Sequence, residues 1–532
     1  MKVTAMKEKE KCFLGLELGS TRIKTVLLGE DHSVLSEGAY TWGDHLEEGY
    51  WSYDLSAVKE GVQDSFASCM MQARERGLGP EHICAIGISA MMHGYLAFDE
   101  KGELLVPFRT WRNTSTSEAA TRLTELFHYN IPQRWSIAHL YQALLNGEDH
   151  VGRVRTLMTL AEYVHFQLTG EKVIGLGDAS GMFPIDLKTL TFDQGMIERF
   201  NALPEVQKMP WQLTDLLPKP LPAGEVAGRL TKEGAAFLDP TGSLPAGIPL
   251  CPPEGDAQTG MIATGTLRQR TGNVSAGTSS FAILVLEKEL SKVYPEIDLV
   301  TSPSGKLVAN VHTNNCTGDI NAWAGVFKEF AASLGMKVSD AELYTLLFQK
   351  ALEGDADGGG ILSFNYYGGE QITGVSEGRP LFMRLPDASF TLANLMRTEL
   401  YSSLATLRLG MDIILQDEGM HFDRILAHGG FFKTPEVGQR ILAAVLDMPI
   451  TVMETADQGG AWGIALLAKY MLEKDGLTLE DYLEEKVFAP EEGITITPRP
   501  EEVTGFKEYL SRYKAALPVE KQACECLKPA KK

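Results

Sequence analysis

The sequence predicts an α/β protein built from two related halves, and three observations lead to this fold class. The chain has 532 residues, more than one ordinary hydrophobic core accommodates, so two or more domains are expected. Strand-like segments lead into an alternation of strands and helices, which is typical of a layered fold with a mixed sheet. A hairpin whose turn consists of Gly, Ser and Thr occurs once in each half.

The first half begins with two apolar runs, residues 12–18 and 23–29, on either side of the turn Gly19-Ser20-Thr21. Aliphatic residues flanking a turn of small residues predict a tight β-hairpin. A third strand at 34–40, an amphipathic helix at about 55–76 and a buried strand at 83–89 follow. The order of these elements predicts a sheet whose later strands are joined through helices.

The second half repeats this order after a break near "PLCPPEGDAQTG" at 249–260, where prolines and a glycine interrupt the pattern. Its hairpin spans 272–287 around the turn Gly277-Thr278-Ser279. The remaining expected elements are strands at 307–312, 424–431 and 449–454, a long helix at about 390–416, and helices that begin at Pro435 and Gly459. One repeat per half chain excludes a solenoid of short repeats.

Composition narrows the class of protein. Hydrophobic residues make up 44% and charged residues 22%, which is typical of a globular protein with a large core. Acidic residues outnumber basic ones by 70 to 49, so neither a nucleic-acid partner nor an anionic membrane surface is expected. No apolar stretch reaches membrane-spanning length, and the N-terminus has no signal-peptide pattern. The seven scattered cysteines indicate reduced thiols, so the cytoplasm is the expected compartment.

The two small-residue turns are candidate phosphate sites. Backbone N–H groups in such turns, with Ser and Thr hydroxyls beside them, form an anion cradle without a lysine. The alternative interpretation is a pair of ordinary hairpin turns. The chain has no G-x-x-x-x-G-K-[ST] motif, and "GLGDASG" at 175–181 has one residue too many for a dinucleotide-binding glycine motif.

Several motifs in register resemble the FGGY family of carbohydrate kinases over residues 12–500. The quoted segments are "GLELGSTRIKTVLL", "MMHG" with "TWRN", "DASGMFPID", "PEGDAQTG", "GTSSFAIL", "NYYGGEQITGVSEGRPLFMRL", "AHGGFFKTPEVGQRILAAVL" and "ADQGGAWGIALLA". The resemblance implies two actin-like (ribonuclease H-like) ATPase domains with a cleft between them. The expected domains are residues 12–257 and 258–500, followed by a C-terminal helix and tail at 501–532.

The resemblance also implies that ATP and Mg²⁺ are used and that a sugar hydroxyl is phosphorylated. Glycines beside the predicted adenosine pocket would let the backbone approach a flat base. The predicted ATP-binding residues are Gly19, Ser20, Thr21, Lys24, Gly277, Thr278, Ser279, Gly429, Gly430 and Thr434.

Asp256 is the predicted catalytic base. Its place in "PEGDAQTG" matches the family segment that carries the catalytic aspartate. Local sequence alone favours the N-cap of a small-residue helix, and the two interpretations are compatible. A carboxylate at a helix N-terminus is expected to be kept ionised by the helix dipole and so to accept a proton.

Glu17 is an acidic residue inside the first strand, two positions before Gly19. A buried carboxylate needs a partner or a nearby cation. The family usually has Asp here, near the metal, and Glu keeps the hard oxygen ligands that Mg²⁺ prefers. We therefore expect Glu17 to bind the metal; the alternative is an ion pair with Lys24 or Arg22.

The predicted sugar-binding residues are Met92, His93, Trp111, Arg112 and Asn113, together with Asp256. "MMHG" closes a strand, and α/β sheets place ligands at the carboxyl ends of strands. Arg112 and Asn113 stand where xylulokinases usually have Asn and Asp, and Ala257 replaces an Asn.

The expected substrate is a ketopentose such as xylulose or a related sugar. A guanidinium binds carboxylates well, so Arg112 leaves an acidic sugar such as gluconate as an alternative. An actin-like ATPase and a sugar-binding regulator without kinase activity are left open as well. The expected partners are the sugar and ATP, and a homodimer is left open.

Overall fold

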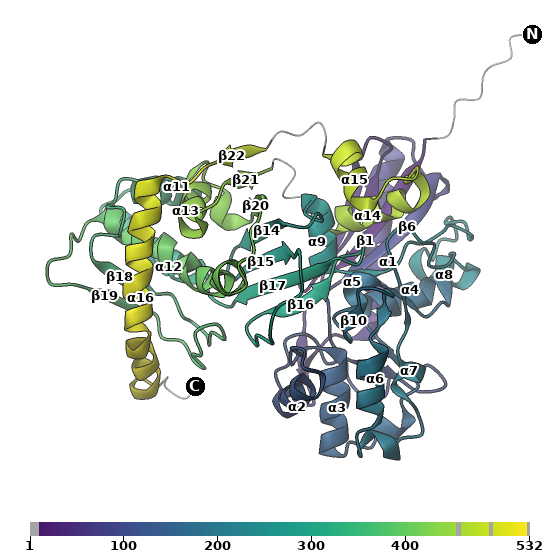
Figure 1. Cartoon of the computed structure of the whole chain (residues 1–532). Coiled ribbons are helices and arrows are strands. Elements are labelled where there is room, and N and C mark those ends of the chain that lie inside the picture. Colours follow the sequence, from purple (N-terminus) through teal and green to yellow (C-terminus); the bar gives the residue numbers. More distant parts are fainter. Residues whose placement is uncertain (1–9, 454–458, 489–492, 529–532) are drawn as a thin grey trace, which may run out of the picture. The chain divides into compact units, whose positions relative to one another are not determined.

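The computed structural model describes residues 10–453, 459–488 and 493–528 (Figure 1). This part of the chain folds into two compact units. The first unit contains residues 10–267, 298–308 and 459–488, and the second contains 268–297, 309–453 and 493–528. Each unit is built around a mixed β-sheet.

The sheet of the first unit has the strand order β13-β6-β1-β2-β3. Strands β1 (Cys12–Leu18), β2 (Arg22–Leu28) and β3 (Val34–Thr41) are antiparallel neighbours, as the apolar runs predict. Strand β6 (Ile83–Ala90) runs parallel to β1, and β13 (Glu254–Gly255) runs parallel to β6. The carboxyl ends of β1, β6 and β13 therefore meet at one edge of this sheet.

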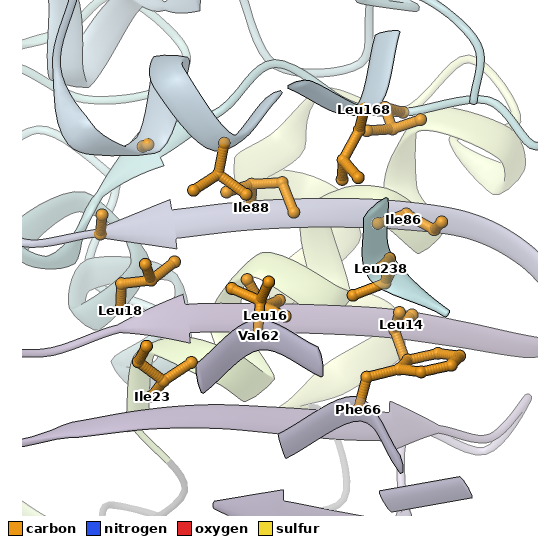
Figure 2. Packing of buried hydrophobic residues seen from close by; sticks show 14 of the residues in the cluster. Leu14, Leu16, Leu18, Ile23, Val62, Phe66, Ile86, Ile88, Leu168 and Leu238 are labelled. Atoms are coloured by element: carbon orange, nitrogen blue, oxygen red, sulfur yellow. The ribbon is translucent and has the colours of Figure 1, made fainter. Parts of the chain in front are cut away.

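The two faces of β1 pack against different helices, because successive side chains of a strand point to opposite faces. Leu14, Leu16 and Leu18 point into a core that includes Val62 and Phe66 of helix α1 (Leu55–Glu75) (Figure 2). The opposite face packs against α14 (Gly459–Glu473).

Gly15 on β1 allows this close approach. A Cβ atom at Gly15 would lie 2.0 Å from the carbonyl oxygen of Ala461, in the first turn of α14. The face of β1 that carries Gly15 also carries Glu17, so the strand aims this carboxylate at the beginning of α14.

The first unit also contains helices and short strands outside this sheet. The predicted helix at 55–76 is confirmed as α1, whereas the helices between residues 117 and 238 were not predicted. The other helices are α2 (Ser117–Phe127), α3 (Ser136–Asn146), α4 (Leu160–Thr169), α5 (Leu176–Ala179), α6 (Gln194–Asn201), α7 (Leu213–Leu216), α8 (Lys232–Leu238), α9 (Asp256–Thr264) and α15 (Leu479–Tyr482). The short strands are β4 (His45–Glu47), β5 (Tyr50–Ser52), β7 (Leu96–Phe98), β8 (Thr156–Met158), β9 (Val173–Gly175), β10 (Ile185–Asp186), β11 (Thr191–Phe192), β12 (Lys219–Leu221) and β16 (Asp298–Thr301).

The second unit has a sheet with the order β17-β15-β14-β20-β21-β22. Its central hairpin, β14 (Thr271–Ala276) and β15 (Ser280–Val285), is antiparallel, as predicted. Strand β20 (Arg424–His428) runs parallel to β14, and β21 (Ile450–Val452) runs parallel to β20. The other strands are β17 (Leu307–Thr313), β18 (Ile361–Phe364), β19 (Leu381–Arg384) and β22 (Ile494–Ile496).

The long helices of the second unit begin close to the predicted positions. Helix α12 (Leu392–Asp412) confirms the long helix at 390–416, and α13 (Val437–Leu446) begins two residues after Pro435. Glu454, the end of the predicted strand at 449–454, lies outside the described residues. The other helices are α10 (Gly318–Ser333), α11 (Asp340–Ala351) and α16 (Pro500–Cys526).

The structure bears on the expected absence of membrane-spanning segments and on the state of the cysteines. No helix among the described residues has both the length and the apolar character that a membrane crossing requires. All seven cysteines lie in the described part of the chain and carry free thiols.

Candidate active site

The candidate site of the first unit begins where β6 and β13 end side by side. Gly255 of β13 pairs with Ala90 of β6, so Asp256 begins helix α9 beside the loop that follows β6. A Cβ atom at Gly255 would lie 2.1 Å from Cγ of Met92. The glycine before the aspartate therefore lets the two predicted site segments contact each other.

Asp256 is held by two main-chain donors. Its Oδ1 accepts hydrogen bonds from the N–H groups of Met92 (3.2 Å) and Ala257 (2.9 Å). The residue at the N-cap of α9 is Gly255, and Asp256 is the first helical residue, so the N-cap interpretation was wrong by one position. Both donors therefore hold the same carboxylate oxygen, Oδ1.

Opposing influences act on the pKa of Asp256. Its side chain reaches solvent, yet the surrounding protein removes much of its hydration, and this loss raises the pKa above its usual value. The hydrogen bonds from Met92 and Ala257 oppose the shift without cancelling it. The loss of hydration outweighs these hydrogen bonds, so the carboxylate has an increased affinity for a proton.

Glu17 accepts a hydrogen bond from the first turn of α14. Its Oε2 lies 3.0 Å from the N–H nitrogen of Ala461, where a helix N-terminus favours negative charge. The alternative ion pair with Lys24 is not formed, because Lys24 pairs with Glu37 at 3.0 Å. Burial first, and then the charge of Asp256, raise the pKa of Glu17 to about 7.

The oxygen ligands in this region fit Mg²⁺. Glu17 and Asp256 repel each other electrostatically, and a divalent cation near both would relieve that repulsion. Within the described ranges, no group of three or more His, Cys, Asp or Glu side chains could hold a metal by itself. Mg²⁺ commonly binds one or two carboxylates and completes its shell with water and substrate phosphates.

His93 lies in the loop after β6 and is buried. Its φ angle is 68°, and the next residue, Gly94, has φ of 93°, so the chain makes a left-handed bend here. This conformation is strained for a non-glycine residue, and such strain clusters at functional sites. The ring stacks on Trp135 at a centroid distance of 6.4 Å.

The tautomer of His93 follows from its contacts. Nδ1 lies 3.2 Å from the carbonyl oxygen of Gly181, which can only accept, so Nδ1 carries the proton and Nε2 is an acceptor. Burial first, and then the nearby Arg134, lower the pKa of His93 to about 3. The imidazole is therefore neutral at physiological pH.

The segment 110–113 lies next to the loop that contains His93, because Arg109 pairs with Tyr95 in a β-bridge. Trp111 is 40% exposed and offers an open aromatic face. Arg112 forms an ion pair with Asp44 and lies over the ring of Trp51 at 4.0 Å.

Asn113 uses its amide inside the protein. Its Oδ1 accepts from the N–H of Trp51 at 2.8 Å, and its Nδ2 donates to the carbonyl of Trp51 at 2.9 Å. This pairing is structural, and direct contact of Asn113 with a sugar stays a prediction.

The turn Gly19-Ser20-Thr21 follows β1 and is held through its carbonyl groups. The carbonyl of Gly19 accepts from Trp42, and that of Ser20 accepts from Tyr53. Ser20 and Thr21 are exposed, and their N–H groups donate no hydrogen bond within the described part of the chain. Lys24 lies on β2, opposite Glu17, and is partly buried.

The second unit presents a similar turn. The carbonyls of Gly277 and Thr278 accept from the main-chain N–H groups of Thr317 (3.0 Å) and Cys316 (2.9 Å). Ser279 completes the turn, and its carbonyl accepts from the N–H of Gly277 at 2.9 Å.

The predicted adenosine-binding glycines lie beside this turn, in the same unit. Gly429 follows β20 with φ of 102°, and a Cβ atom there would lie 2.6 Å from the carbonyl oxygen of Ala276. Gly430 is exposed, whereas Thr434 is buried. The structure thus brings Gly429 next to the end of β14, where the turn begins.

Two further acidic residues near Asp256, Glu254 and Asp178, were not predicted. The carboxylate of Glu254 accepts from the N–H groups of Gly177 (3.3 Å) and Asp178 (2.9 Å). Cβ atoms at Gly175 and Gly177 would lie 2.3 and 2.6 Å from the oxygens of Glu254. The glycines of "GLGDASG" therefore make room for a carboxylate, and this motif is the signal that could have pointed to the contact.

These two acids keep protons at neutral pH more readily than usual. Burial, and then the charge of Asp178, raise the pKa of Glu254 to about 8. Burial also raises the pKa of Asp178 to about 7, and its Oδ2 accepts from the hydroxyl of Thr159 at 2.6 Å. Proton uptake here limits the negative charge that accumulates behind Asp256.

Comparison with known proteins gives matches along most of the chain. The N-terminal domain of the FGGY family of carbohydrate kinases matches residues 12–263, and the C-terminal domain of the same family matches residues 272–472. A xylulose kinase from Haemophilus influenzae is 23% identical over 530 residues, which cover 94% of this chain and 98% of the relative.

Solved structures are similar over nearly the whole length. The crystal structure of xylulose kinase from Rhodospirillum rubrum gives a TM-score of 0.77 at 20% identity and covers 96% of this chain and 99% of its own. The crystal structure of gluconate kinase from Lactobacillus acidophilus gives 0.76 at 17% identity, with the same two coverages. These similarities confirm the predicted fold class, the actin-like fold with two α/β domains.

Proposed function

The chain belongs to the FGGY family of carbohydrate kinases, and we propose that it transfers the γ-phosphoryl group of ATP to a hydroxyl of a ketopentose such as xylulose. The predictions of the family and of the enzyme class are confirmed by the family matches. The substrate, the residue roles and the domain limits at 257 and 500 are parts of the proposal.

The observation that carries the proposal is the arrangement of Asp256. Main-chain donors fix Oδ1, and the loss of hydration raises the proton affinity of the carboxylate. We infer that Oδ2 accepts the proton of the sugar hydroxyl as the hydroxyl oxygen attacks the γ-phosphorus of ATP and ADP leaves. A positioned base with a pKa shifted toward the working pH contributes roughly two to four orders of magnitude in rate.

The sugar would lie between the loop after β6 and the segment 110–113. Neutral His93 presents Nε2 as a hydrogen-bond acceptor for a sugar hydroxyl. Trp111 offers an exposed apolar face for the C–H groups of the sugar.

A neutral sugar is favoured over an acidic one by the surroundings of Arg112. Its guanidinium is already paired with Asp44 and stacked on Trp51, so a sugar carboxylate would have to displace that acid. The full-length likeness to a relative named xylulose kinase supports a ketopentose as the first candidate.

In each unit, the small-residue turn is proposed to contact phosphate groups of ATP, and in the second unit the glycines after β20 are proposed to approach its base. The exposed N–H groups of Ser20 and Thr21 provide donors for phosphate oxygens, and Thr278 adds an exposed hydroxyl. We propose that Glu17 holds Mg²⁺, either directly or through water. The ion supplies charge neutralisation for the phosphates when it is bound.

A substrate panel tests the proposal. ADP formation is measured with ketopentoses, pentitols, gluconate and glycerol at saturating MgATP. We expect the highest kcat/KM with a ketopentose and little ADP without sugar. Preference for gluconate would replace the proposed substrate, and ADP formation that is independent of every sugar would contradict the kinase proposal.

A further inference from the structure

We propose that Trp42 and Tyr53 are positioning residues that hold the turn Gly19–Thr21 in its phosphate-binding conformation. Neither residue belongs to a predicted site motif, and both come from the segment between β3 and α1. This role rests on the proposed function, in which the turn binds phosphate, and Trp42 and Tyr53 are the residues that fix its conformation.

The two aromatic residues bind every carbonyl of the turn. The indole N–H of Trp42 donates to the carbonyl of Gly19 at 2.7 Å, and the main-chain N–H of Trp42 donates to the carbonyl of Thr21 at 3.2 Å. The hydroxyl of Tyr53 donates to the carbonyl of Ser20 at 2.8 Å. Three consecutive carbonyls are thus fixed by two residues.

Fixing the carbonyls also fixes the N–H groups, because each peptide unit is planar and its C=O and N–H point in opposite directions. The N–H groups of Ser20 and Thr21 therefore point away from Trp42 and Tyr53 and are available to a ligand. A preorganised set of donors costs less to order when an anion binds.

The donors themselves are rigidly placed. The rings of Trp42 and Tyr53 contact each other at a centroid distance of 4.4 Å. Burial raises the pKa of Tyr53 to about 12, so its hydroxyl keeps the proton that it donates. Two residues before Tyr53, the main chain of Trp51 is bound in both directions by the amide of Asn113.

The second unit uses the same device with different groups. The carbonyls of Gly277 and Thr278 are held by the N–H groups of Thr317 and Cys316, and the hydroxyl of Thr317 adds a second bond to Gly277 at 2.8 Å. Two turns proposed to bind phosphate thus share one feature: residues outside each turn donate hydrogen bonds to its carbonyls. Such hydrogen bonds are expected in both units if they hold the turns in a phosphate-binding conformation.

The variants Trp42→Phe and Tyr53→Phe test the inference, because each keeps an aromatic ring and removes one hydrogen bond. Loss of one bond to the turn should raise the KM for ATP and the dissociation constant for ATP roughly three- to tenfold. The KM for the sugar and the affinity for adenosine, which has no phosphate, should stay within about twofold of the wild type.

Two matched controls separate positioning from general stability. Trp211→Phe removes an indole bond of 2.9 Å to the carbonyl of Val151, and Tyr470→Phe removes a hydroxyl bond of 3.0 Å to the carbonyl of Leu477. Both lie in the first unit and away from the turn's carbonyls, so they should lower the melting temperature without changing the affinity for ATP.

The outcomes distinguish this inference from the proposed function. If Trp42→Phe and Tyr53→Phe bind ATP as the two controls do, the positioning role is wrong even if the enzyme phosphorylates a sugar. If the wild type phosphorylates no sugar but both variants lose affinity for ATP and not for adenosine, the kinase proposal fails and the positioning role stands. Equal losses of affinity for ATP and for adenosine would also overturn the positioning role, because they would indicate a general structural defect.

Discussion

At the scale of single residues, Glu17 shows how a carboxylate is accommodated inside a strand. Its position on β1 follows from alternation, since Leu16 and Leu18 take the core face. Its hydrogen-bond partner, Ala461, is 444 residues away in the sequence. No local pattern around Glu17 could have predicted that contact, although the unusual acid in an apolar run signalled that a partner was needed.

The metal role of Glu17 gives a prediction at this scale. Glu17→Gln removes the negative charge but keeps the shape, so the Mg²⁺ concentration at half-maximal rate should rise roughly tenfold and kcat should fall. Glu17→Asp keeps the charge and should retain most of the activity. The measurement is a Mg²⁺ titration of sugar phosphorylation at fixed ATP. Identical titrations for the wild type and Glu17→Gln would assign the carboxylate a purely structural role at the beginning of α14.

At the scale of elements, the contact between β1 and α14 depends on glycine. Gly15 leaves room for the carbonyl of Ala461, and Gly87 on β6 does the same for Ile464, whose carbonyl oxygen would lie 2.6 Å from an added Cβ. This packing places the first turn of α14 against Glu17. The sequence predicted a helix from Gly459 and the strands, but it carried no signal that this helix packs on β1.

Gly15→Ala tests this packing. The added methyl group cannot fit unless α14 shifts, so the free energy of unfolding should fall by about 1–3 kcal/mol. The hydrogen bond to Glu17 should weaken with the shift, and the Mg²⁺ requirement should rise in parallel. Gly152→Ala is the control, because a Cβ atom there meets nothing within 4 Å. Equal urea midpoints for the two variants would show that the approach is not tight.

Elements with regular apolar patterns were predicted well, and those without such patterns were not. The hairpins β1–β2 and β14–β15 and helix α12 agree with the expected segments because hydrophobic period and turn residues define them locally. The pairing of Asn113 with Trp51 joins a loop to strand β5, and no periodicity indicates it. The candidate site therefore followed from motifs, whereas the supports of Asp256 and of the turn Gly19–Thr21 required the structure.

At the scale of the whole molecule, buried acids in the first unit link its stability to pH. Glu162 on α4 is completely buried, and burial, followed by the charge of Asp178, raises its pKa well above 4.5. The folded state therefore keeps a proton that the unfolded state loses above that value. The stabilisation is complete below the unfolded pKa and is lost as the pH rises toward the folded pKa.

Glu162→Gln removes this linkage. As the pH rises above about 5, the wild type should lose up to about 1.4 kcal/mol of unfolding free energy per pH unit from this group until the folded-state pKa is reached. Urea titrations of the variant should show a flatter dependence on pH, with the largest gain over the wild type at the alkaline end. The control is Glu60→Gln, on the exposed side of α1. Parallel pH profiles for the wild type and Glu162→Gln would contradict the raised pKa.

The role of Asp256 as the base of a sugar-dependent kinase is tested by replacing its carboxylate. ADP formation is measured with and without a ketopentose for the wild type, Asp256→Asn and the control Asp64→Asn, which changes an exposed carboxylate on α1. We expect sugar-dependent turnover for the wild type and Asp64→Asn, and a loss of roughly two to four orders of magnitude for Asp256→Asn with ATP affinity retained. Near-normal sugar-dependent turnover by Asp256→Asn would contradict this role.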